Sequence, residues 1–192
     1  VEKGIATDPN FIEQDQHLMT LYSEGKMDME DYLEFSIAPL TSIPKPQVKA
    51  LVEECVVERI LPKQFTQAKS LIEQLHHEQI EMVIISASVA FLVEAVGEKL
   101  GIQHALGIDL VEKDGCFTSE ISGIPSYREG KVARLHQWLA DQPQSYSEIH
   151  FFTDSINDLP LCEAADFAYL VNPCPQLKQY VDRPNWSLLE WY

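Results

Sequence analysis

A short aliphatic run directly after an amphipathic helix most constrains the fold of this chain. Residues 65–79 place apolar side chains at helical spacing, and the uninterrupted run from Met82 to Ile85 follows them. Such a run predicts a strand buried on both faces of a parallel sheet. A predicted helix over 131–140 is likewise followed by apolar runs at 149–152 and 167–171. This alternation predicts an α/β fold: a Rossmann-like parallel sheet flanked by helices, with right-handed crossovers.

The first third of the chain has another pattern. Apolar residues recur at helical spacing in residues 11–22 and 29–37, and Asp28 is suited to cap the second of these helices. Prolines then break the chain before a helical period resumes at Val48. We therefore expect residues 1–60 to form a small all-helical subdomain and residues 61–192 to form the α/β core.

Two further β elements are expected within this core. Residues 104–121 alternate as in a hairpin, with Lys113-Asp114-Gly115 as its turn, and residues 186–191 form a short last strand.

Charge and composition narrow the classes of partner. The chain of 192 residues carries 14 Lys+Arg against 30 Asp+Glu, a net charge of −16. This charge repels nucleic acid and anionic lipid, and no apolar run approaches the ~20 residues of a membrane span. We expect no nucleic-acid or membrane partner, and a monomer or homodimer. The cysteines form no C-x-x-C pair, which predicts reduced thiols and a cytoplasmic location; they are Cys55, Cys116, Cys162 and Cys174.

Polar residues follow two of the predicted parallel strands. Ser86 comes directly after the run that ends at Ile85, and Asp154 comes just after the run 149–152. Ligands of open α/β sheets bind beyond the carboxyl ends of the strands, so both residues are expected at one crevice. Asp154, Asn157 and Asp158 offer two carboxylates and an amide within five residues, which suits Mg²⁺. A helix-capping loop explains the same residues equally well.

Lys131 is a third candidate because it lies near the start of a predicted helix. The positive end of the helix dipole disfavours a lysine there, unless the lysine helps to hold an anion. Taken alone, the residue is better explained as an ordinary surface lysine.

Together these segments resemble motifs II, III and IV of the haloacid dehalogenase-like (HAD) phosphatases, in the right order and at fitting separations. The resemblance is to the phosphoserine-phosphatase-like branch, which has a helical cap, and an Asn-Pro turn near the C-terminus supports it. The segments are residues 84–88 (IISAS), 130–135 (GKVARL), 153–161 (TDSINDLPL) and 171–173 (VNP).

The resemblance implies a role for each matching residue. Ser86 and Ala87 would bind the phosphoryl group, with Ser86 donating its hydroxyl. Lys131 would neutralise phosphoryl charge and the attacking carboxylate. Asp154 would be a Mg²⁺ ligand, and Asn157 and Asp158 would order the site around the metal, water and Lys131. Asp158 would be catalytic and Asn157 would also bind phosphate. Residues 1–60 would form the cap. The implied activity is Mg²⁺-dependent hydrolysis of a small phosphorylated metabolite, such as phosphoserine or histidinol phosphate, through an aspartyl-phosphate intermediate.

The family's nucleophile motif is a departure from this resemblance. No two aspartates of the chain are separated by a single residue, so D-x-D does not occur. We expect the first strand, with this motif, to precede residue 1 and to lie between the strands that end near Ser86 and Asp154. Thr153 stands where the family commonly has glycine. The alternative hypotheses are a non-catalytic phosphate-binding or interaction module of the same fold, and an unrelated α/β domain with chance motif matches.

Overall fold

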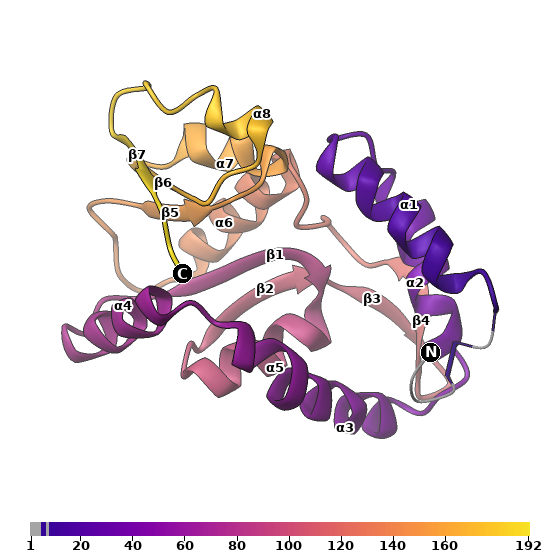
Figure 1. Ribbon diagram of the computed structural model, residues 1–192. Helices are drawn as coiled ribbons and strands as arrows, with labels where there is room; N and C mark the ends of the chain where they lie inside the picture. The colour runs from indigo at the N-terminus through magenta and orange to yellow at the C-terminus, as the bar shows by residue number, and fades with distance from the viewer. Residues whose placement is uncertain (1–4, 7) are drawn as a thin grey trace.

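The structure, a computed structural model, describes residues 5, 6 and 8–192. Its N-terminal part is helical from Phe11 to Lys63 (Figure 1), while residues 1–4 and 7 of the expected subdomain lie outside the described residues. Asp28 caps the second helix by accepting hydrogen bonds from the backbone N–H groups of Glu30 and Asp31. The elements of this part are α1 (Phe11–Ser23), α2 (Met29–Ile37), the 3₁₀ turn η1 (Ala38–Leu40), α3 (Lys45–Cys55), the π turn η2 (Val56–Ile60) and the 3₁₀ turn η3 (Leu61–Lys63).

A parallel strand–helix–strand unit follows. It consists of α4 (Thr66–His77), β1 (Val83–Val89), α5 (Ala90–Leu100) and β2 (His104–Ile108). The strand predicted from the aliphatic run is β1, and it pairs in parallel with β2. The prediction that residues 104–121 form one hairpin was therefore wrong for the first five residues. The hairpin is only β3 (Leu110–Lys113) and β4 (Cys116–Ile121), joined at the predicted Asp114-Gly115 turn.

The second half of the core is a three-stranded parallel sheet in the order β5-β6-β7. The strand β7 coincides with the short last strand expected near residues 186–191. The elements are α6 (Glu129–Asp141), β5 (His150–Thr153), the 3₁₀ turn η4 (Ile156–Asp158), α7 (Leu159–Ala164), β6 (Phe167–Val171), α8 (Pro175–Lys178) and β7 (Trp186–Leu189). The predicted α/β class with parallel sheets is confirmed.

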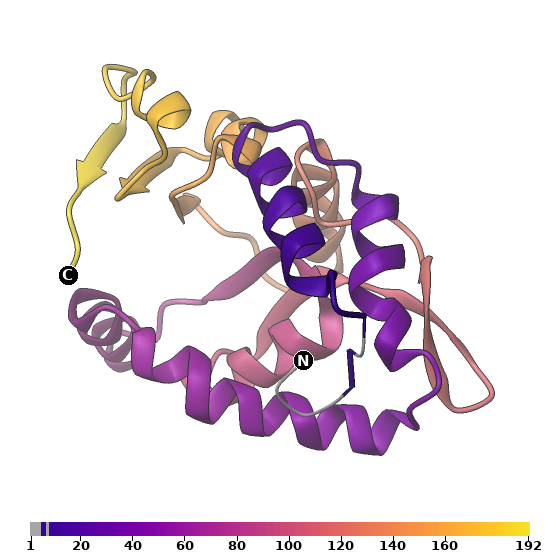
Figure 2. The ribbon, with the colours of Figure 1, turned by 45° about the vertical axis from the view of Figure 1, so that its right-hand side comes forward.

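The two parallel sheets are not hydrogen-bonded to each other. Within the described residues, β1 pairs only with β2, and β5 pairs only with β6. The strands β1 and β5 are the neighbouring strands of the two sheets in both ribbon views (Figures 1 and 2). Both β1 and β5 therefore have one edge without a β-sheet partner, on the side that faces the other sheet.

The helical part and the α/β part share a hydrophobic core. Leu33 of α2 and Val48 of α3 are fully buried in the same cluster as Val89, Ile108 and Phe117. A second cluster, which includes Leu170 and Leu177, supports the β5-β6-β7 sheet. The helices α2 and α3 thus pack on the same core as Val89, at the carboxyl end of β1.

Candidate active site

A buried ion pair lies at the centre of the site. The Nζ atom of Lys131, in the first turn of α6, lies 2.5 Å from Oδ1 of Asp158, at the end of η4. The two residues are only 4% and 6% exposed. The hydroxyl of Thr153 donates a hydrogen bond of 2.7 Å to the second oxygen, Oδ2. The surface-lysine explanation of Lys131 is therefore wrong, because the side chain is enclosed and paired.

The approach of α6 to this site depends on Gly130. A Cβ atom at this position would lie 1.9 Å from the carbonyl oxygen of Pro125. Because glycine has no Cβ, the segment before α6 can fold back over the first turn of the helix. This packing fixes the position of the adjacent Lys131.

Asp154 follows β5 immediately and stays open to solvent on one side. Its backbone carbonyl is held by the N–H group of Cys174, at 2.8 Å, in the loop after β6. The surrounding protein removes water from the carboxyl and raises its pKa, and the charge of Asp158 raises it further. A hydrogen bond from its own backbone N–H group and the charge of Lys131 lower the pKa, against these two effects.

Ser86 lies within β1 rather than after it, which corrects the predicted end of that strand. The pairing with β2 runs to Ile85 and resumes at Val89, so residues 86–88 form an irregular segment that includes Ala87. The backbone carbonyl of Ser86 accepts a hydrogen bond of 2.5 Å from the fully buried hydroxyl of Ser126. This bond ties the Ser86 segment to the segment that leads into α6.

Asn157 joins the core to the helical part of the chain. Its side chain is 3% exposed, and its Nδ2 donates a hydrogen bond of 2.8 Å to the carbonyl of Tyr22, the penultimate residue of α1. Its Oδ1 accepts hydrogen bonds from Tyr127 Oη at 3.1 Å and Arg128 Nε at 3.4 Å.

Sequence reasoning did not assign roles to Tyr22, Ser126, Tyr127 and Arg128. Tyr22 faces the same site, since burial and the charges of Asp158 and Asp154 raise the pKa of its phenol. The short segment 126–128 adjoins the glycine-lysine motif, which is the signal that could have drawn attention to it. The contact of Tyr22 depends on tertiary packing, because 135 residues separate it from Asn157.

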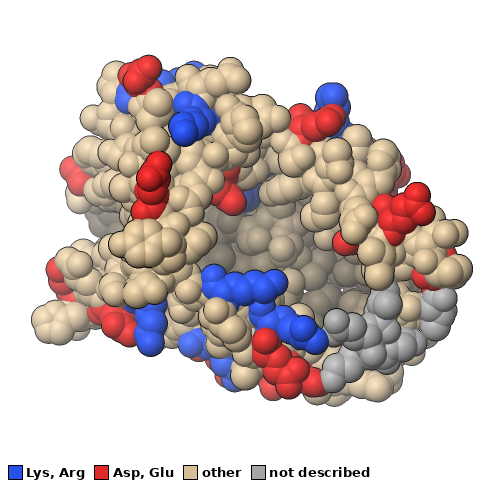
Figure 3. Space-filling model, viewed as in Figure 1, with Lys and Arg blue, Asp and Glu red and all other residues tan. Residues whose placement is uncertain are grey.

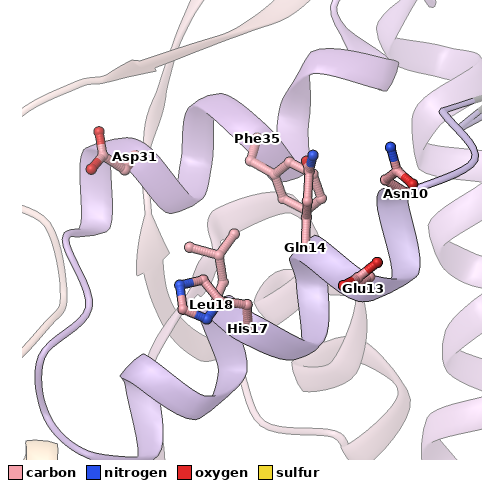
Figure 4. A pocket seen from close by; sticks show the side chains of 7 residues that line it. All are labelled: Asn10, Glu13, Gln14, His17, Leu18, Asp31 and Phe35. Atoms are coloured by element: carbon pink, nitrogen blue, oxygen red, sulfur yellow. The ribbon is translucent and has the colours of Figure 1, made fainter.

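The surface is hollowed between the β5-β6-β7 lobe and α1 (Figure 3). A separate open hollow of about 720 Å³ lies between α1 and α2 (Figure 4). None of the candidate site residues lines it; its lining residues are Asn10, Glu13, Gln14, His17, Leu18, Asp31 and Phe35.

Two features are absent from the described residues. None of their helices is long and apolar enough to cross a membrane. No three of their His, Cys, Asp and Glu side chains are grouped as a metal cluster.

The family is decided by comparison with known proteins. Residues 1–163 match the haloacid dehalogenase-like hydrolases. The chain belongs to this family. A histidinol-phosphatase of Neisseria meningitidis serogroup C (strain 8013) is 30% identical to it over the whole chain and 88% of that protein. The chain spans about half of three other curated relatives, 53%, 50% and 50%.

Solved structures agree with this assignment. A protein of unknown function from Bordetella pertussis Tohama I has a TM-score of 0.86 at 30% identity, over 97% of this chain and 86% of that one. A substrate-bound phosphoserine phosphatase has a TM-score of 0.71 at 22% identity, over 96% and 83% of the two chains, and shows the common fold. The resemblance to the HAD phosphatases is confirmed.

Proposed function

We propose that this HAD phosphatase is a Mg²⁺-dependent phosphomonoester hydrolase that acts on a small phosphorylated metabolite through an aspartyl-phosphate intermediate. The observation that carries the proposal is the buried Lys131–Asp158 pair beside Asp154. Enclosing a lysine and a carboxylate is costly in a structural core. The same arrangement is useful where a phosphoryl group and a cation must be held, since positioning and charge neutralisation supply most of the catalysis of phosphoryl transfer.

The nucleophile is proposed to come from a further strand. We infer that a parallel strand lies between β1 and β5 and ends in the family's aspartate. The edges of β1 and β5 without a β-sheet partner support the inference, because such a strand would pair on both sides. The aspartate would attack phosphorus, the substrate's alcohol would leave, and water would then hydrolyse the aspartyl phosphate.

The residues of this chain then have distinct roles. The hydroxyl of Ser86 and the backbone at Ala87 bind oxygens of the phosphoryl group. The ammonium of Lys131, held in place by Asp158, neutralises the charge of the phosphoryl group and of the nucleophile. Asn157 would order this site through its contact with Tyr22 of α1 and would contribute to phosphate binding.

The residues present fit a divalent cation only in part. Asp154 supplies a carboxylate whose raised pKa reflects burial and the nearby negative charge of Asp158, and a bound cation would oppose both effects by favouring the charged form. Mg²⁺ is often held by one or two carboxylates together with phosphate oxygens and water, so one carboxylate from this chain is compatible with it. Bound there, the cation would supply charge neutralisation at the phosphoryl oxygens.

Histidinol phosphate and phosphoserine are the substrates to test first. A relative 30% identical to this chain is named a histidinol-phosphatase, and one from Streptococcus thermophilus that is 27% identical is named a phosphoserine phosphatase. We further propose a cytoplasmic enzyme that is a monomer or homodimer, which size-exclusion chromatography with light scattering tests for the oligomeric state.

Hydrolysis of p-nitrophenyl phosphate by the protein from its complete reading frame tests the proposed function. We expect activity with Mg²⁺ and none with EDTA. Asp154→Asn should abolish most of this activity, because it removes a charged ligand. The matched control is Asp141→Asn, at the exposed end of α6, which should retain activity. Equal losses in both variants, or full activity in EDTA, would contradict the proposal.

A further inference from the structure

Arg128 has an unusual backbone conformation for its residue type. It precedes α6 with φ 49° and ψ −122°, a region that glycine enters freely and that side-chain-bearing residues rarely adopt. The sequence nevertheless has an arginine here. Because strained residues persist mainly where the surroundings and the function require them, the side chain needs an explanation.

The guanidinium is held on three sides. Its Cζ lies 5.0 Å from the centre of the Tyr127 ring, in a cation–π contact. Its Nε donates to Oδ1 of Asn157 at 3.4 Å. At the turn after α1, a Cβ placed on Gly25 would lie 3.5 Å from its Nη2. The side chain is thus fixed beside the site residues instead of extending into solvent.

Arg128 has no carboxylate partner among the residues that the structure describes. Other arginines do: Arg134 pairs with Asp109 and Arg183 pairs with Glu163, each at 2.5 Å. The contrast is informative in a chain with a net charge of −16, where carboxylates are abundant. An arginine that is fixed in place without a carboxylate partner keeps hydrogen-bond donors available for an anion from outside the protein.

The charges of the site favour the same conclusion. The cation of Lys131 is already paired with Asp158, and Asp154 adds a further negative charge. A dianionic phosphoryl group that binds here would therefore find the charge of Lys131 already neutralised by Asp158. The planar guanidinium presents parallel N–H donors that match two oxygens of a phosphoryl group.

We propose that Arg128 binds the non-bridging oxygens of the substrate's phosphoryl group through its Nη donors, as a second fixed cation beside Lys131. This inference rests on the proposed function. It assigns Arg128 to the phosphoryl group common to all substrates, and not to a carboxylate of the leaving group.

The experiment compares Arg128→Gly and Arg128→Lys with the control Arg183→Lys, in the protein from the complete reading frame. Binding of inorganic phosphate is measured by calorimetry with Mg²⁺ present, together with KM, kcat and Tm. Arg128→Gly should weaken phosphate binding at least tenfold while keeping or raising Tm, because glycine suits this conformation. Arg128→Lys should keep part of the affinity, and Arg183→Lys should match the wild type.

Substrates with and without a carboxylate identify the anion. The loss in kcat/KM should be equal for phosphoserine and p-nitrophenyl phosphate. A loss confined to phosphoserine, or unchanged phosphate affinity in Arg128→Gly, would overturn the inference. A wild-type protein that binds phosphate but hydrolyses no phosphomonoester would refute the proposed function alone, and the calorimetric comparison would still decide the role of Arg128.

Discussion

Replacing Lys131 by methionine removes the positive charge of the central ion pair while keeping most of the volume of the side chain. Methionine has a similar length and no charge, so Asp158 would stay buried without its cation. The hydroxyl of Thr153 would still donate to Oδ2 of Asp158, but no other residue pairs with Oδ1 in the contacts found for the described part of the chain.

The magnitude follows from the burial of the pair. Removing one partner of a buried ion pair costs about 3–5 kcal/mol, and exposures of 4% and 6% place this pair in that class. For a domain of this size, each kcal/mol lowers Tm by about 2–4 °C, so Lys131→Met should lower Tm by about 6–20 °C. Asp158→Asn should lower the free energy of unfolding by a similar amount, because it leaves the buried lysine without its carboxylate partner.

Urea denaturation of the two single variants and of the double variant measures the coupling. The double variant should be more stable than either single variant, since it removes both charges and keeps an acceptor for Thr153. If the free energy lost by the double variant equals the sum of the two single losses, the pair is not coupled and the reasoning fails.

Two further predictions concern the same site. Asp154→Asn should raise Tm at pH 7 in the presence of a chelator, because the raised pKa of Asp154 disfavours its carboxylate in the folded state; the gain should vanish as pH falls toward the ordinary value of 3.8, and a pH-independent gain would contradict this cause. Gly130→Ala should destabilise the protein by about 1–3 kcal/mol through the clash with Pro125, although alanine normally favours helices. Gln137→Ala, at an exposed position of the same helix, is the control, and an equal loss there would contradict the argument.

Local patterns identified most of the elements. The aliphatic run of β1, the periodicity of α4 and α6 and the turn at Asp114 are properties of neighbouring residues, so the sequence alone could locate them. Alternation did not distinguish β2 from a hairpin arm, because it carries no information on whether a strand pairs in parallel.

The site was predictable where its residues lie in motifs and not where they meet through packing. Lys131, Asp154 and Asp158 come from two short segments, and the structure brings Lys131 and Asp158 into contact. The irregular pairing around Ser86 depends on how far β2 extends beside β1, which the sequence does not encode locally. The bond between Asn157 and Tyr22 arises only when α1 packs beside the core.

The separation between the two parallel sheets also bears on the order in which the chain folds. The β1–α5–β2 unit and the β5-β6-β7 sheet each form contacts between residues that are close in sequence. Joining them requires contacts between elements far apart in sequence, such as β1 and β5, and the formation of long-range contacts of this kind is slow. The two units are therefore expected to acquire amide protection independently and early, and the edges of β1 and β5 are open to mispairing unless the proposed strand pairs with them.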